Sequence, residues 1–78
     1  MIPKTFEGFV DWSKGRKLPW AGPNPDNDHE FIQVDHGEPR VGQPEFYRVI
    51  TYNDQDDFVN TDVYFSDGTH KHTNQKWT

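Results

Sequence analysis

The side chains best suited to chemistry stand near the end of the chain, in "VYFSDGTHKH", where His70 and His72 follow an Asp-Gly pair. Imidazole nitrogens are common metal ligands, and two histidines at alternate positions of a strand share one face, about 7 Å apart. A zinc site needs three or four ligands, so His29, His36 or a carboxylate would have to converge on this pair. We interpret the pair as rim histidines of a sheet, with histidine-based metal binding as an alternative function.

Two acidic segments also resemble chemical motifs without completing them. "DNDHE" places acids at alternate positions, as a calcium loop does, but Phe31 and Gly37 occupy the positions where an EF-hand needs Gly and Glu. "NDQDD" at residues 53–57 is a polar turn of the same kind. The chain has no cysteine, and neither of its two serines stands in a nucleophile-type motif. We therefore predict no catalytic residues, no metal ligands, no cofactor and no enzymatic activity.

Length and composition predict one small domain. The chain has 78 residues and no disulfide or thiolate zinc site to supplement its core, but it has 12 large aromatic side chains spread along its length. No stretch approaches the roughly 20 apolar residues of a membrane span, and the N-terminus lacks the apolar run of a signal peptide. We expect a cytoplasmic protein without membrane contact, as a monomer or homodimer.

Charge is concentrated in the middle of the chain. The whole carries a formal −5, whereas residues 23–62 hold ten acids and two arginines, a balance of −8. This balance is opposite to that of a direct nucleic-acid binder. An acidic surface with exposed aromatics can instead imitate a phosphate backbone and dock on the basic surface of a nucleic-acid-binding protein. The candidate partner-binding residues are Asp26, Asp28, Glu30, Asp54, Asp56, Asp57, Asp62, Trp20, Tyr52 and Tyr64.

The pattern predicts an α+β fold with a short N-terminal helix packed on a three- to four-stranded antiparallel β-meander, with closure into a barrel left open. Residues 1–18 contain the helix, because Thr5 can cap it, apolar residues follow at i, i+3 and i+4, and Gly15 can end it. Residues 19–30 read as a Pro/Gly/Asp-rich loop, in which Trp20 either is exposed to a partner or folds back onto the core. Residues 31–78 read as the sheet.

Within that sheet, "EFYRVITY" is apolar on both faces, which favours a central or strongly curved strand. Asp67-Gly68 predicts a two-residue hairpin turn. In that register Phe65 lies opposite His70, and Trp77 lies opposite Phe58. Both histidines then share the face of Val63 and Phe65. A three-residue loop with a bulge would reverse the faces.

"TYNDQDDFVNTDVYFSDG" resembles the strand, acidic turn and strand of Tudor and other SH3-like barrels, over about a quarter of the chain. The resemblance implies a peptide-binding module with an aromatic cage for a methylated cation, an alternative function. Its candidate residues are Tyr47, Tyr52, Phe58 and Tyr64. The chain is small, acidic, aromatic and free of cysteine, and in this it also resembles phage-encoded accessory proteins. The most specific form of the nucleic-acid-mimicry hypothesis is therefore a phage-type inhibitor of a host factor.

Overall fold

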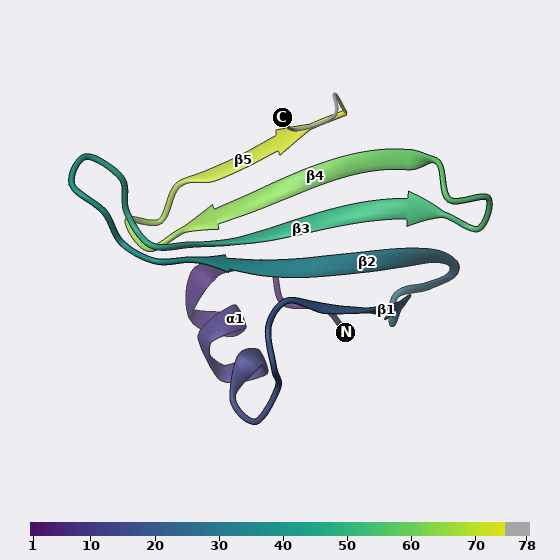
Figure 1. Cartoon of the computed structure of the whole chain (residues 1–78), viewed down its shortest axis with the longest axis horizontal. Helices are drawn as coiled ribbons and strands as arrows, with labels where there is room; N and C mark the ends of the chain where they lie inside the picture. Colours follow the sequence, from purple (N-terminus) through teal and green to yellow (C-terminus); the bar gives the residue numbers. More distant parts are fainter. Residues whose placement is uncertain (75–78) are drawn as a thin grey trace.

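The computed structural model describes residues 1–74 as one helix and one open antiparallel sheet (Figure 1). Helix α1 is Phe6–Ser13, and the strands are β1 Trp20–Asn24, β2 Asn27–Gly37, β3 Phe46–Asn53, β4 Phe58–Phe65 and β5 His70–Thr73. Each strand pairs with the next along the chain, in the order β1-β2-β3-β4-β5. The predicted α+β meander is therefore confirmed, with five strands in place of three or four.

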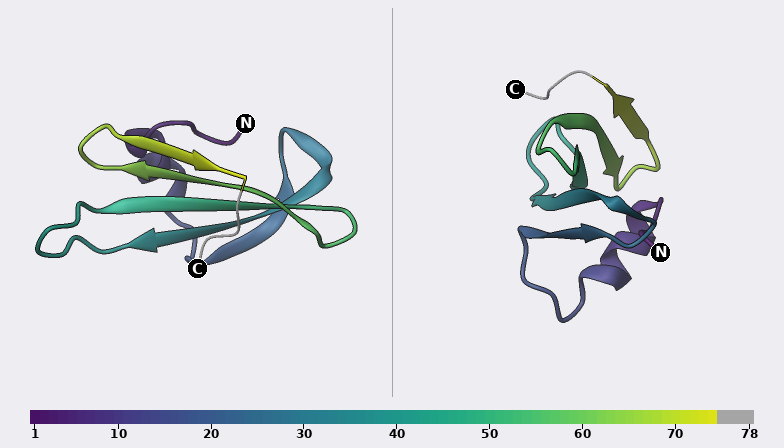
Figure 2. Two further views of the ribbon diagram at one scale, coloured as in Figure 1. Left: turned by 90° about the horizontal axis from the view of Figure 1, so that it is seen from above. Right: turned by 90° about the vertical axis from the view of Figure 1, so that its right-hand side faces the viewer.

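The sheet is strongly twisted and does not close (Figure 2). In the residues that the structure describes, β1 and β5 are its two edges, and they do not pair with each other. The central strand is β3, as its two apolar faces predict. Closure into a barrel, which the sequence left open, is not observed.

Helix α1 begins and ends as the sequence predicts. Thr5 is the N-cap, and its Oγ1 accepts a hydrogen bond from the amide of Gly8 at 3.0 Å. Gly15 follows the C-terminus with φ of 78°, a left-handed conformation that glycine adopts without strain. The side chain of Phe9 is fully buried, and it anchors the helix on one face of the sheet.

That face, here the helix-side face, carries the main core. Phe9 packs with Ile32, Val34, Tyr47, Val49 and Tyr64. Its ring centroid lies 5.6 Å from that of Tyr47 and 5.2 Å from that of Tyr64. Trp12 meets Trp20 edge to face at 5.3 Å, so the first edge strand is held under the helix. The opposite face of the sheet carries the ion pair of Arg48 with Asp35 at 2.9 Å.

The predicted loop at residues 19–30 is wrong. Residues Trp20–Asn24 form β1, and β2 already begins at Asn27. Proline lacks an amide hydrogen and breaks a central strand, but an edge strand hydrogen-bonds on one side only and tolerates it. Pro23 lies in such an edge strand, while Pro19 precedes it and Pro25 lies in the turn that follows. Prolines alone could not distinguish this edge strand from a loop.

The predicted two-residue hairpin between β4 and β5 is also wrong. Tyr64 lies opposite His70, and Val63 lies opposite Lys71. The amide of Gly68 donates to the carbonyl of Phe65 at 3.0 Å, and the amide of Phe65 donates to the carbonyl of Thr69 at 2.9 Å. The loop therefore has three residues and a left-handed bulge at Gly68, whose φ is 92°. The predicted pairing of Trp77 with Phe58 lies outside the described residues.

The observed register reverses the predicted faces. His70 and His72 lie on the helix-side face, with Asp62 and Tyr64. Lys71 moves to the opposite face, where its ammonium lies 5.6 Å from the ring centroid of Phe65 and its side chain stays exposed at the sheet edge. Because β5 is an edge strand of the described sheet, this register does not bury the ammonium group of Lys71.

We predict that Gly68→Ala lowers the melting temperature by about 4–8 °C, since a left-handed alanine costs about 1 kcal/mol. No atom lies within 4 Å of the Cβ position, so the cost comes from the backbone alone. Thermal unfolding followed by circular dichroism measures it. Asp67→Asn is the control, because an Asn side chain also accepts the bond that Asp67 takes from Thr69 at 2.9 Å. An unchanged melting temperature for Gly68→Ala would contradict the bulged turn.

Candidate functional site

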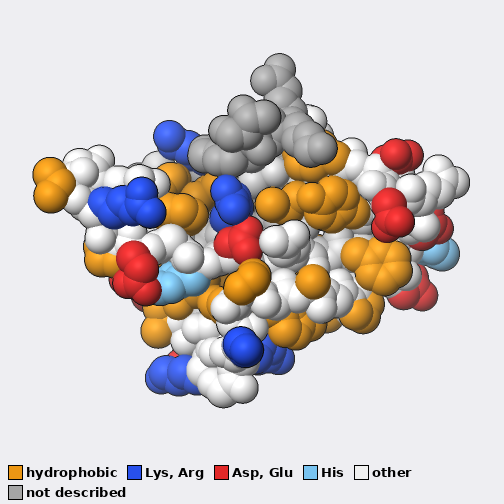
Figure 3. All heavy atoms as spheres, viewed as in Figure 1, with side chains coloured by type: hydrophobic (Ala, Val, Ile, Leu, Met, Phe, Trp, Pro, Cys, Tyr) orange, Lys and Arg blue, Asp and Glu red, His pale blue; other side chains and the backbone are white. Residues whose placement is uncertain are grey.

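Two acidic turns occupy one end of the sheet. Glu30 of β2 lies opposite Asn53 of β3, so the β1–β2 turn and the β3–β4 turn lie side by side. In Figure 3 a group of red carboxylates lies at the right, at the end of the sheet where these turns are, with no blue Lys or Arg side chain within it, and other red side chains lie near the centre and at the left. We call this surface the acidic end and define it by its six carboxylates: Asp26, Asp28, Glu30, Asp54, Asp56 and Asp57.

Asparagines shape these turns, and the aspartates project from them. Asn24 Oδ1 accepts from the amide of Asp26 at 2.9 Å, and Asn53 Oδ1 accepts from the amides of Gln55 and Asp57, each at 2.9 Å. Within residues 1–74 the three carboxylates of the β3–β4 turn make no hydrogen bond or ion pair, and all three are exposed. They are free to face a partner.

Of the remaining predicted site residues, two lie in the core. Tyr64 is 8% exposed beneath the helix, and Trp20 is partly buried, with its ring packed on Trp12. The second of the two readings of Trp20, folding back onto the core, is the observed one. Tyr52 lies on the opposite face of the sheet, edge to face with Phe58 at 6.3 Å. Neither Trp20 nor Tyr64 belongs to the exposed acidic end.

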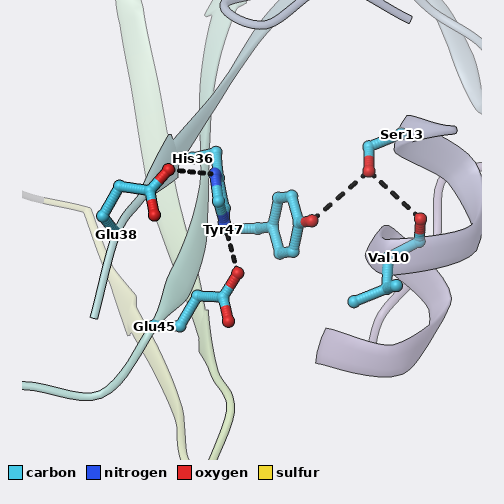
Figure 4. A network of polar contacts seen from close by, with 6 residues as sticks. All are labelled: Val10, Ser13, His36, Glu38, Glu45 and Tyr47. Carbon is cyan, nitrogen blue, oxygen red and sulfur yellow. Dashed lines mark hydrogen bonds and ion pairs between the residues drawn. The ribbon is translucent and has the colours of Figure 1, made fainter. Parts of the chain in front are cut away.

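The four aromatic residues of the suggested cage do not converge. Tyr47 and Tyr64 are buried on the helix-side face, whereas Tyr52 and Phe58 pair on the other. Figure 4 shows how Tyr47 is used: its hydroxyl lies 3.3 Å from Ser13 Oγ of the helix. Its ring lies 4.7 Å from the ring of His36. This tyrosine joins helix to sheet and does not line a cage.

His36 in the same network is flanked by two carboxylates (Figure 4). Its Nε2 lies 2.6 Å from Glu45 Oε2, and its Nδ1 lies 3.9 Å from Glu38 Oε1. Ser13 Oγ donates to the carbonyl of Val10 at 3.1 Å and also contacts the hydroxyl of Tyr47. The arrangement ties the β2–β3 hairpin and the helix end to Tyr47.

Asp62 lies between His70 and His72 and contacts both. Its Oδ1 lies 2.9 Å from His70 Nε2 and 2.7 Å from His72 Nδ1. The His70 ring stacks on Tyr64 at 4.5 Å, with the planes 3° apart. Within residues 1–74 no group of three His, Cys, Asp or Glu side chains is arranged to hold a metal ion. The two imidazoles are directed at one carboxylate oxygen, which their alternate spacing alone could not reveal.

Asp62 and the histidines border a hollow of about 420 Å³ on the helix-side face, beyond the reach of α1. Residues 2–4 border the hollow together with strands β1 to β5, and its lining includes Asp26 and Glu30 of the acidic end. Volumes of 300–1,000 Å³ are typical of ligand sites. Sequence reasoning missed this hollow, because no motif marks the length of sheet that a short helix leaves uncovered.

Comparisons with known proteins found no match to this chain. No family model matches it, and neither a curated protein nor a solved structure is significantly similar to it. In the part of the chain that the structure describes, no helix is long and apolar enough to cross a membrane. Function must therefore be argued from the acidic end and the hollow themselves.

Burial raises the pKa of the Tyr64 phenol to about 12, with a smaller contribution from the charge of Asp62. The unfolded chain has a tyrosine pKa of about 10. The folded state therefore holds this proton more tightly, and its stabilising effect is complete below pH 10 and is lost as the pH rises through 12.

We predict that the wild-type chain loses about 1 kcal/mol of unfolding free energy between pH 9 and pH 11 through this group. Tyr64→Phe lacks the ionisable phenol and should lose less over the same interval. Urea unfolding of both proteins at the two pH values measures the difference. Equal losses in both proteins would show that Tyr64 does not hold its proton more tightly in the folded state.

Proposed function

We propose that this chain is a non-enzymatic protein-binding domain, which docks its acidic end on a basic surface of a partner. The observation that carries the proposal is the register of β2 against β3, which brings Asp26, Asp28 and Glu30, from the β1–β2 turn and the start of β2, beside the three aspartates of the β3–β4 turn. A compact group of exposed charges of one sign raises association rates with an oppositely charged partner and selects against acidic ones.

The spacing of the turns supports nucleic-acid mimicry as the mode of docking. The two hairpins are centred two strand spacings apart in the sheet, about 10 Å. The major groove of B-DNA, which is about 12 Å wide, likewise separates two rows of phosphates. Two separate groups of carboxylates offer a basic partner two clusters of negative charge, as the two phosphate rows of a duplex do. The partner that fits is a nucleic-acid-binding protein, and the proposed role is that of a phage-type inhibitor acting in the cytoplasm.

The local geometry supports a rigid display of charge. Asp56 has φ of 65°, in the left-handed region, and the Asn53 side chain fixes the residues on either side of it. Because the backbone is already bent as the turn requires, little conformational entropy is lost when a partner orders these carboxylates. Only the side-chain torsions of the aspartates remain to be fixed.

We predict that the triple variant Asp54→Asn, Asp56→Asn, Asp57→Asn loses most of its affinity for a basic partner while remaining folded. Asparagine keeps the turn geometry, because it tolerates the left-handed conformation as aspartate does. The control variant Glu7→Gln, Asp11→Asn, Glu38→Gln removes the same charge from exposed residues elsewhere. Binding of a lysine decapeptide, measured by calorimetry, should fall in the first variant and persist in the second.

If the chain mimics nucleic acid, we predict that both salt and duplex DNA release the partner that it captures. The immobilised chain should retain nucleic-acid-binding proteins from a host lysate at about 50 mM salt and release them at about 300 mM salt. Excess duplex DNA at low salt should release the same proteins, since both ligands occupy one basic surface. A partner that stays bound in high salt and ignores DNA would contradict mimicry.

A further inference from the structure

The hollow on the helix-side face carries features of a binding site that its role in the fold does not explain. Its floor is formed by Ile32 and Val49, with the buried residue Thr51 beside them. Its border is polar: Asn24 and Glu30 lie toward the acidic end, and Asn60, Asp62 and the two histidines lie toward β5. An apolar floor within a ring of polar groups is typical of a small-ligand site.

Thr51 is the first such feature. The residue is 6% exposed, and within residues 1–74 its hydroxyl makes no hydrogen bond, but unlike the hydroxyl of Thr61 it is not sealed from solvent. A hydroxyl that faces a hollow without a protein partner can donate to or accept from a group that enters from outside. Thr51 lines the hollow, so a ligand there can supply the missing hydrogen bond.

The second feature is an excess of hydrogen-bond acceptors. Glu30 receives a bond from Asn24 on Oε1 alone, and Asp62 receives both histidines on Oδ1 alone, so each carboxylate keeps one oxygen free within residues 1–74. A neutral imidazole that donates through one nitrogen keeps the other as an acceptor. The formal charge around the hollow is −2, from Asp26, Glu30 and Asp62 against Lys4.

The matching ligand group is a planar cation with several donors on an aliphatic stem. An arginine side chain has five N–H donors in a fixed plane, no acceptor, and a stem of three methylene groups that packs on apolar surface. Lysine has the charge but only a compact ammonium group, and it cannot span acceptors on both sides of the hollow.

We propose that the hollow receives an arginine side chain of the basic partner, which inserts beside the acidic end during docking. This inference rests on the proposed function, because Asp26 and Glu30 belong both to the acidic end and to the lining of the hollow. The acidic turns attract the partner at long range, and the hollow distinguishes arginine from lysine at contact.

The test compares three short lysine peptides that differ at one central residue: arginine, lysine, or citrulline, the uncharged relative of arginine. We expect the arginine peptide to bind about tenfold more tightly than the other two, through the charge-assisted bonds that only the guanidinium makes. In wild-type protein the amide NMR signals of Thr51 and Asn60 should shift with the arginine peptide and much less with the others.

The two buried threonines without hydrogen-bonded hydroxyls supply a matched pair of variants. Thr51→Val should reduce the arginine preference below about threefold. Thr61 is fully buried with an unpartnered hydroxyl, but it lies on the opposite face of the sheet, so Thr61→Val should keep the preference. Both substitutions replace threonine by the shape-matched valine in a strand, and both variants should melt no lower than wild type.

The outcomes separate this inference from the proposed function. If all three peptides bind equally well, or if Thr51→Val keeps the arginine preference, the hollow is not an arginine site and the acidic end alone binds. If no peptide binds at low salt, the proposed function fails, and the inference fails with it.

Discussion

The fold depends on one aromatic side chain, Phe9, seated between Tyr47 and Tyr64. It is the largest fully buried residue in the part of the chain that the structure describes, and its ring contacts two strands of the sheet at once. Deleting a buried phenylalanine costs about 3–5 kcal/mol, a large part of the roughly 5–15 kcal/mol that stabilises a typical domain. Phe6 and Trp12 also pack against the core from the helix, but only Phe9 is fully buried. The position of Phe9 therefore decides which part of the sheet is covered.

Element lengths explain the hollow. A helix of eight residues is about 12 Å long, whereas the 11 residues of β2 extend about 36 Å. The helix can cover one end of the helix-side face but not both. Toward the acidic end the face is bordered by residues 2–4 and turns polar, with Thr51, Asn60 and Asp62 where Val and Tyr stand beneath the helix. The polar side chains around the uncovered part of the face reduce the apolar surface that it exposes to water.

Local chemistry allowed the helix and the central strand to be predicted, because Thr5, Gly15 and the two apolar faces of β3 act through near neighbours. The misassigned elements are those whose outcome depends on distant neighbours. Pro23 excludes a strand only where the strand is paired on both sides. Asp67-Gly68 is compatible with both a two-residue and a three-residue loop, and these differ in which face of the sheet receives each residue of β5. Exposure of Trp20 and Tyr64 depended on the placement of the helix, and the hollow depended on its length. The acidic turns were identifiable as sequence, but their adjacency required the β2–β3 register.

The acidic end shows how a marginal domain can tolerate a cluster of like charges. Asn24 and Asn53 provide the hydrogen bonds that bend the turns. Asp26 Oδ2 accepts from the amide of Ile2 at 3.2 Å, whereas within residues 1–74 the carboxylates of the β3–β4 turn make no hydrogen bond. The carboxylates of the β3–β4 turn remain in water, where repulsion between them is screened over about 8 Å at physiological salt. Their repulsion is therefore small in the free protein, and it is relieved further when a cationic surface approaches. In the hollow, too, different residues stabilise the fold and remain free to bind. Ile32 and Val49 pack in the sheet, whereas within residues 1–74 Glu30 and Asp62 each keep one carboxylate oxygen without a hydrogen bond.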